Sequence, residues 1–95
     1  MGFIDKILGR KTADPGERRR RLLEIGRITD GVILDGQPND EGLEIVVYLY
    51  TLNGVDFEAS DFLTEEQQRD SIKYAPGAKV GIRYDPRNQG NSIVE

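Results

Sequence analysis

The segment from Glu44 to Ser60 predicts a β-hairpin, in whose second strand apolar residues (Val55, Phe57, Ala59) alternate with polar ones (Asp56, Glu58, Ser60). Asn53-Gly54 lies at its centre, and the dipeptide suits a two-residue type I′ turn because both residues there need a positive φ. The turn sets the register. We expect four pairs, namely Leu52 with Val55, Tyr50 with Phe57, Tyr48 with Ala59 and Val46 with Asp61, which gather one apolar face across both strands.

The first strand of this hairpin is apolar on its other face too, at Ile45, Val47 and Leu49. Such a strand is either covered on both sides or part of an exposed apolar patch. We expect the helix that precedes the strands to cover it, because one face of a sheet commonly packs on a helix. An exposed patch would instead favour a dimer, so the prediction is a monomer or a weak homodimer.

The other elements complete a mainly β domain over residues 27–95. Before the hairpin, the pattern predicts a strand over Ile28–Asp35, with Gly31 as a candidate bulge or bend, and a polar loop over Gly36–Gly42. After the hairpin, a capping box of Thr64 and Gln67 starts a helix of about two turns that ends near Lys73-Tyr74. A strand over Val80–Tyr84, a turn that continues through Asn91 and a last short strand over Ser92–Val94 complete the chain. This is a small barrel-like or rolled antiparallel sheet of about five strands, with one short helix before the fourth.

Residues 1–26 form a separate, partly flexible helical arm in this prediction. Phe3, Ile4, Ile7 and Leu8 fall on one stripe of a short helix. That helix is too brief to be stable alone in water, so it packs on its own domain, docks on a partner, lies on a membrane or frays.

A second helix follows in the arm. Asp14 suits its N-cap, Pro15 its first position and Gly26 its end, while Leu22, Leu23 and Ile25 offer apolar contacts.

Charge separates the same two parts of the chain. Residues 1–27 hold eight basic and four acidic residues, a net +4, whereas the remainder holds five basic and thirteen acidic residues, a net −8. A basic arm of this kind contacts nucleic acid, an anionic membrane, an acidic protein or its own acidic body.

Five arginines carry the nucleic-acid alternative. Guanidinium groups bind phosphate oxygens in a bidentate manner. Four consecutive helical residues point in all directions, however, and no aromatic side chains interleave with them, so a solvated basic segment is the favoured interpretation. The arginines are Arg18, Arg19, Arg20, Arg21 and Arg27.

The inventory of reactive side chains argues against an enzyme. The 95 residues include no cysteine and no histidine, which excludes thiolate chemistry, Cys/His zinc sites and imidazole bases. We predict no catalytic residue, no cofactor and no metal. Tyr84-Asp85-Pro86 is interpreted as a turn that closes a strand, and the acidic residues as a solvated face. No apolar stretch reaches the length of a membrane span, which favours a cytoplasmic protein that is peripheral to a membrane at most.

Several of these segments together resemble the bacterial family of unknown function numbered 3592. The resemblance covers residues 26–94 and lies in Tyr48-Leu49-Tyr50, Asn53-Gly54 with Phe57, Tyr74-Ala75-Pro76-Gly77, Val80-Gly81-Ile82-Arg83-Tyr84-Asp85-Pro86 and Ser92-Ile93-Val94. It implies a small β-rich domain without known activity. Many members of that family carry transmembrane helices beside the domain, and this sequence shows none.

These observations favour a non-enzymatic β domain that binds a protein. The candidate interaction residues are Phe3, Ile4, Ile7, Leu8, Arg18, Arg19, Arg20, Arg21 and Arg27. An anionic membrane surface is a further possible partner of the arm. The alternative is a small β-barrel that binds nucleic acid through the arm.

Overall fold

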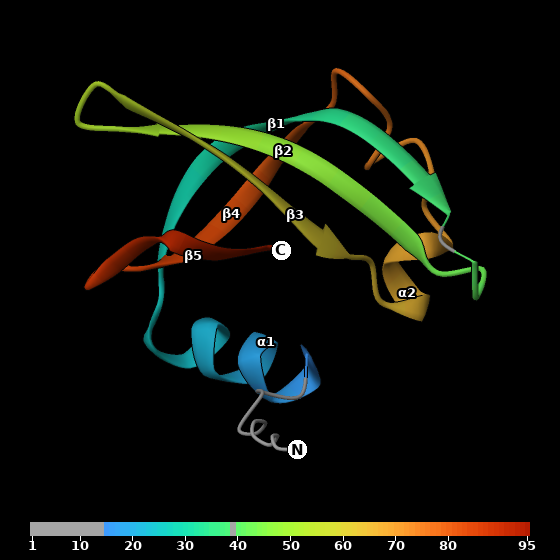
Figure 1. Cartoon of the computed structure of the whole chain (residues 1–95), viewed down its shortest axis with the longest axis horizontal. Coiled ribbons are helices and arrows are strands. Elements are labelled where there is room, and N and C mark those ends of the chain that lie inside the picture. The colour runs from blue at the N-terminus through green and yellow to red at the C-terminus, as the bar shows by residue number, and fades with distance from the viewer. Residues whose placement is uncertain (1–14, 39) are drawn as a thin grey trace, which may run out of the picture.

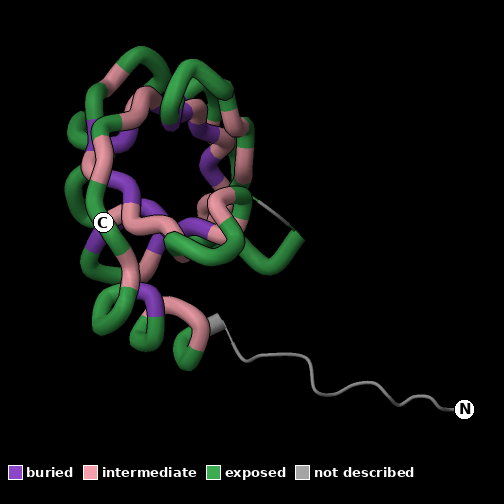
Figure 2. The backbone as a smooth tube through the Cα atoms, turned by 90° about the vertical axis from the view of Figure 1, so that its left-hand side faces the viewer, coloured by how far each residue is buried: buried purple, intermediate pink, exposed green. Residues whose placement is uncertain are grey.

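A computed structural model describes residues 15–38 and 40–95 of the chain as a mainly β domain (Figure 1). The elements are α1 (Pro15–Ile25), β1 (Arg27–Pro38), β2 (Glu44–Leu52), β3 (Val55–Phe62), α2 (Glu65–Gln68), β4 (Lys79–Asp85) and β5 (Asn88–Val94). All neighbouring strands are antiparallel, in the order β3-β2-β1-β4-β5. The sheet curls into a nearly closed barrel with α1 outside it (Figure 2). The predicted fold class is confirmed.

The central hairpin has the predicted register. All four expected pairs between β2 and β3 are present. Asn53 and Gly54 have φ values of 52° and 81°, as a type I′ turn requires. Local turn chemistry therefore determines how these two strands meet.

The inward residues of β2 form the centre of the core. Val46, Tyr48 and Tyr50 are buried together with side chains from every part of the barrel, including Ile33, Leu63, Val80, Ile82 and Val94. The rings of Tyr48 and Tyr50 lie 6.0 Å apart between centroids, and those of Tyr50 and Phe57 lie 5.4 Å apart. This aromatic row fills the barrel from β2 to β3.

Strand β1 is longer than the sequence predicts, because Gly36 to Pro38 continue the pairing with β2 instead of forming a loop. The bulge also lies elsewhere. The register shifts between Ile33 and Asp35, whereas Gly31 pairs regularly with both β2 and β4. Its lack of a side chain serves another purpose: a Cβ on Gly31 would lie 2.6 Å from Cγ1 of Ile82. Gly31 therefore lets the Ile82 side chain fill the barrel.

Helix α1 begins at Pro15 and is followed by Gly26, as predicted, while Asp14 lies outside the described residues. The expectation that this helix covers Ile45, Val47 and Leu49 is wrong. It packs on β4 and β5. Only Gly26 separates the helix from β1, and a Cβ there would meet the carbonyl oxygens of Leu22 and Tyr84. This short connection holds α1 beside β4.

Helix α2 has the predicted capping box, in which Thr64 Oγ1 accepts a hydrogen bond from the Gln67 amide and Gln67 Oε1 accepts one from the Thr64 amide. The predicted length is wrong, since the helix ends at Gln68. Asp70 Oδ1 accepts a bond from the Lys73 amide at 3.3 Å, which favours a turn. The Tyr74 side chain is buried, and its hydroxyl donates to the carbonyl of Glu95. The chain thus folds back into the barrel instead of continuing as a helix.

The C-terminal strands form a tighter hairpin than predicted. Strand β5 begins at Asn88, so Gln89 to Asn91 belong to a strand and not to a continuing turn. Asp85 pairs with Asn88, and Asp85 Oδ1 accepts a bond from the Arg87 amide at 2.8 Å. The structural interpretation of Tyr84-Asp85-Pro86 is therefore confirmed for the Asp85 side chain, which stabilises the turn.

Candidate functional site

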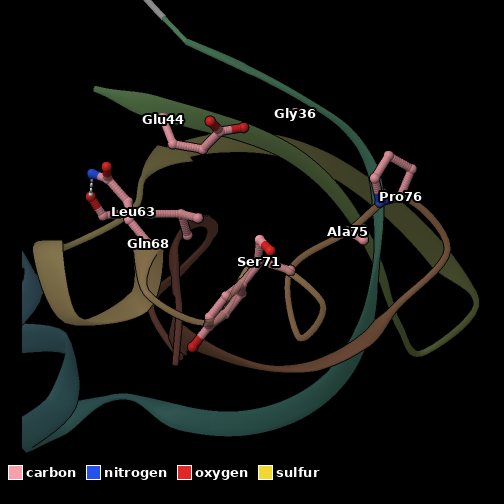
Figure 3. A pocket seen from close by; sticks show the side chains of 8 residues that line it. Gly36, Glu44, Leu63, Gln68, Ser71, Ala75 and Pro76 are labelled. Carbon is pink, nitrogen blue, oxygen red and sulfur yellow. Dashed lines mark hydrogen bonds between the residues drawn. The ribbon is translucent and has the colours of Figure 1, made fainter. Parts of the chain in front are cut away.

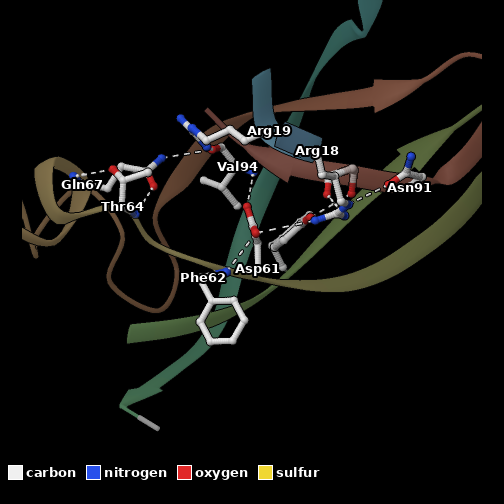
Figure 4. Close-up of polar contacts among 10 residues, drawn as sticks. Arg18, Arg19, Asp61, Phe62, Thr64, Gln67, Asn91 and Val94 are labelled. Carbon is white, nitrogen blue, oxygen red and sulfur yellow. Dashed lines mark hydrogen bonds and ion pairs between the residues drawn. The ribbon is translucent and has the colours of Figure 1, made fainter. Parts of the chain in front are cut away.

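The arginine run of α1 divides into two pairs with different surroundings. Arg18 and Arg19 turn toward β5 (Figure 4). Arg20 and Arg21 are exposed, and Arg20 lies 3.7 Å from Glu17 on the same helix. Arg27, on β1, is exposed as well. Two of the five arginines predicted as an interaction site therefore contact the protein's own barrel.

Arg18 binds three groups at once. Its Nε donates to Asn91 Oδ1 at 3.0 Å, its Nη2 donates to the Ser92 carbonyl at 2.5 Å, and its Nη1 lies 3.8 Å from the Asp61 carboxylate. Arg19 donates from Nη1 to the Val94 carbonyl at 2.7 Å. Both side chains thus satisfy carbonyl groups of the edge strand β5, which is hydrogen-bonded to β4 on one side and to no strand of the described part of the chain on the other.

These contacts lie along the seam, the line where β3 and β5, the two end strands of the sheet, lie side by side. Side chains close the seam. Tyr50 Oη donates to the Gln89 carbonyl at 2.6 Å, Gln67 Nε2 donates to the Val94 carbonyl at 3.0 Å, and Asp61 Oδ2 accepts from the Val94 amide at 3.2 Å. Each of them satisfies a backbone group that a ladder between strands would otherwise satisfy.

The pKa values of two side chains near the seam, Asp61 and Tyr48, are both raised. Burial raises the pKa of Asp61, opposed by the hydrogen bond from the Val94 amide and by the Arg18 guanidinium. Burial also raises the pKa of Tyr48, although its hydroxyl shares a 2.8 Å hydrogen bond with Ser92 Oγ. The seam therefore holds Asp61 where its charged form is costly.

We expect Asp61 to make stability depend on pH. Because its pKa is raised on folding, its contribution is fully present below the unfolded pKa and is lost as the pH rises through the folded pKa. Urea unfolding of the wild type and of Asp61→Asn at pH 4 and pH 7 measures this. The stability difference between the two proteins should shift in favour of the wild type at pH 4. A difference that is independent of pH, or shifts toward the variant, would contradict it.

The second notable surface is the outer apolar face, which lies across β1, β2 and the end of β3. Leu34 is 43% exposed and Phe62 is 42% exposed, while the others are half-buried. The register makes the face continuous, because Phe62 pairs with Ile45, and Val32 pairs with Leu49. Its members are Val32, Leu34, Ile45, Val47, Leu49 and Phe62.

Acidic side chains border the outer apolar face. Asp35 pairs with Val47 from the β1 side, and Glu58 pairs with Leu49 from the β3 side. Both acids are exposed. Lys79 pairs with Val32 and supplies a basic group at the far border. The face therefore combines an apolar centre with a mainly acidic border along β1 and β3.

A cavity of about 260 Å³ opens at the end of the barrel near α2 (Figure 3). Gln68 and Leu63 lie on one side of it and Ala75 and Pro76 on the other. Glu44 contributes the one charged side chain among the eight lining residues, which are Gly36, Glu44, Leu63, Gln68, Ser71, Tyr74, Ala75 and Pro76. We call this cavity the barrel mouth.

The sequence analysis did not identify Glu44 or the seam. A signal for Glu44 was present, since the register of the hairpin places it on the inward face with Val46 and Tyr48. A carboxylate at an inward position is unusual and indicates a polar opening. The seam has no comparable signal, because its partners are far apart in the chain; Arg18 and Asn91, for example, are separated by 73 positions in the sequence.

Other predictions concern residues or chemistry beyond these surfaces. Phe3, Ile4, Ile7 and Leu8 lie outside the described residues. Within residues 15–38 and 40–95, no three or more acidic side chains gather as metal ligands would, and neither helix is long and apolar enough to cross a membrane.

Comparison with known proteins supports the resemblance found in the sequence. No curated protein and no solved structure matches the chain. One family model matches, over residues 25–95, which is the part of the chain that runs from the end of α1 through the whole barrel. The chain therefore belongs to the family described as domain of unknown function DUF3592.

Proposed function

We propose that this domain is a non-enzymatic protein-interaction module and that its partner binds the outer apolar face. The observation that carries the proposal is the composition of β2, whose outward positions hold Ile45, Val47 and Leu49. The outward positions of β3 are polar along most of the strand, as at Asp56 and Glu58, which is the usual pattern of a sheet that faces water.

The barrel does not need these outward side chains for its own core. The core is built from the inward residues of β2 and their partners, such as Tyr48 and Ile82. Helix α1, which would be the obvious cover, packs on β4 and β5. A continuous apolar surface that α1 does not cover favours a contact with another molecule.

Charge favours a protein with basic groups over a membrane or a nucleic acid. Residues 28–95 carry a net charge of −8, and Asp35 and Glu58 border the face. Such a surface repels phosphates and anionic lipid headgroups and attracts basic side chains. The nucleic-acid alternative would depend on the exposed Arg20, Arg21 and Arg27, since Arg18 and Arg19 bind β5.

Site-specific photo-crosslinking in the native host tests the proposal with the full chain. An aromatic photo-crosslinking residue replaces Phe62 in one variant and Ile72 in another. Ile72 is 84% exposed and lies outside the face, so it is the matched control. We expect a covalent adduct with a second protein at position 62 and none at position 72.

A second experiment adds Val47→Lys to the variant that carries the photo-crosslinking residue at position 62. Lysine at the centre of the face places a charge in the apolar contact and repels a basic partner, so the adduct should decrease about tenfold or more. Ile72→Lys should leave it unchanged. Circular dichroism confirms that each variant folds. An adduct only with lipid, only with a second copy of the chain, or equally at both positions would overturn the proposal.

A further inference from the structure

The geometry points to the barrel mouth as a binding site for a single alkyl-ammonium or guanidinium group. The site lies apart from the outer apolar face, since Glu44 points to the inner side of β2 whereas Ile45, Val47 and Leu49 point outward. The inference therefore stands or falls independently of the proposed function.

Size limits the ligand first. Sites for whole cofactors or drug-sized molecules generally measure about 300–1,000 Å³, and the barrel mouth holds about 260 Å³. A nucleotide or an extended peptide is too large to enter. One side chain or a small molecule of similar length fits, and the mouths of β-barrels are a common place for such ligands.

The polar groups that line the barrel mouth favour a ligand that donates hydrogen bonds. Glu44 supplies a half-buried carboxylate to which no residue of the described part of the chain donates a hydrogen bond. Gln68 uses its Nε2 to donate to the Leu63 carbonyl at 3.0 Å, which leaves its Oε1 as an acceptor. Ser71 adds a hydroxyl. An ammonium group has three donors and no acceptor, and it complements this set.

The remaining wall suits an alkyl stem. Leu63, Tyr74, Ala75 and Pro76 line the cavity with apolar surface. Gly36 brings the backbone of β1 close to Glu44, because a Cβ at that position would lie 3.0 Å from Glu44 Oε2. The cavity thus combines one negative charge with apolar walls, a combination that suits a long amphipathic cation such as lysine.

Titration of the ¹⁵N-labelled full-length protein with Nα-acetyl-lysine N-methylamide tests the inference. We expect saturable shifts of the amide signals of Gly36, Glu44, Ser71 and Ala75, with a dissociation constant on the order of 1 mM, as is typical for a ligand of this size. The uncharged Nα-acetyl-norleucine N-methylamide has a similar shape and should not saturate them. Butylamine distinguishes the source of the cation, because equal affinity indicates a free amine and weaker affinity indicates a lysine of a protein.

Two variants distinguish binding at the barrel mouth from a general effect of the protein's negative charge. Glu44→Gln keeps the shape of the side chain and should weaken binding about tenfold, since it removes a charge-assisted hydrogen bond. Glu58→Gln removes one negative charge from the exposed face of β3 and should leave the affinity unchanged. Ser71→Ala, at an exposed position, should also weaken binding, but less than Glu44→Gln does. Equal weakening by Glu44→Gln and Glu58→Gln, or saturation by the norleucine compound, would overturn the assignment.

Discussion

Gly31→Ala is expected to lower the free energy of unfolding by about 2–3 kcal/mol, because overpacking of a filled core costs this much. The new Cβ would lie 2.6 Å from Cγ1 of Ile82 and 2.9 Å from the Leu49 carbonyl oxygen on β2. The Ile82 side chain is fully buried, and the carbonyl belongs to a paired strand, so neither can move away easily. Urea unfolding followed by circular dichroism measures the loss, and the melting temperature should fall on the order of 10 °C.

Gly81→Ala is the matched control for that experiment. Gly81 also lies within a strand, but a Cβ there would first meet the end of the Glu95 side chain, at 3.3 Å. That side chain can move, and alanine in a strand reduces the entropy of the unfolded chain, so Gly81→Ala should be neutral or slightly stabilising. A similar loss in both variants would show that the cost is general to strand glycines and not due to the approach of Ile82.

Arg18→Ala is expected to cost about 2 kcal/mol of stability, because it removes hydrogen bonds to Asn91 and to the Ser92 carbonyl and takes the nearest cation from Asp61. The value is set below that of a fully buried pair since a third of the Arg18 side chain, 33%, is exposed. Thermal unfolding of the purified protein measures the change.

Arg21→Ala controls for charge and for helix propensity, as Arg21 lies on the same helix and is exposed. We expect it to change stability by less than about 0.5 kcal/mol. Arg18→Lys should fall between the two, because lysine keeps the charge but loses the planar fork that reaches two acceptors. If Arg18→Ala and Arg21→Ala were equally stable, the seam would not depend on this arginine.

The role of the arginine run shows where reasoning from the sequence stopped. Composition correctly marked residues 1–27 as basic, and the alternatives included contact with the protein's own acidic body. Nothing local distinguished Arg18 and Arg19 from Arg20 and Arg21. The four residues are neighbours in the sequence, and only the packing of α1 on β4 and β5 decides which two face the barrel.

The position of α1 is a second such case. The apolar residues Ile45, Val47 and Leu49 were correctly placed on the outward face of β2, but their cover was wrongly predicted. The pattern of a strand reports that a face is apolar, not which element lies on it. The one-residue connection at Gly26 excludes the helix from that face, and this constraint becomes visible only when the sheet has curled.

What the sequence determined by itself is the local architecture: the hairpin at Asn53-Gly54, the capping box at Thr64 and the five strands. These features depend on groups within a few residues of one another, so the order of amino acids is enough to predict them. The tertiary structure alone decided how the barrel closes, where α1 lies and that Glu44 faces a cavity. Contacts such as Asp61 with Val94 join segments far apart in the chain, and they form only when strand curvature brings the ends of the sheet together.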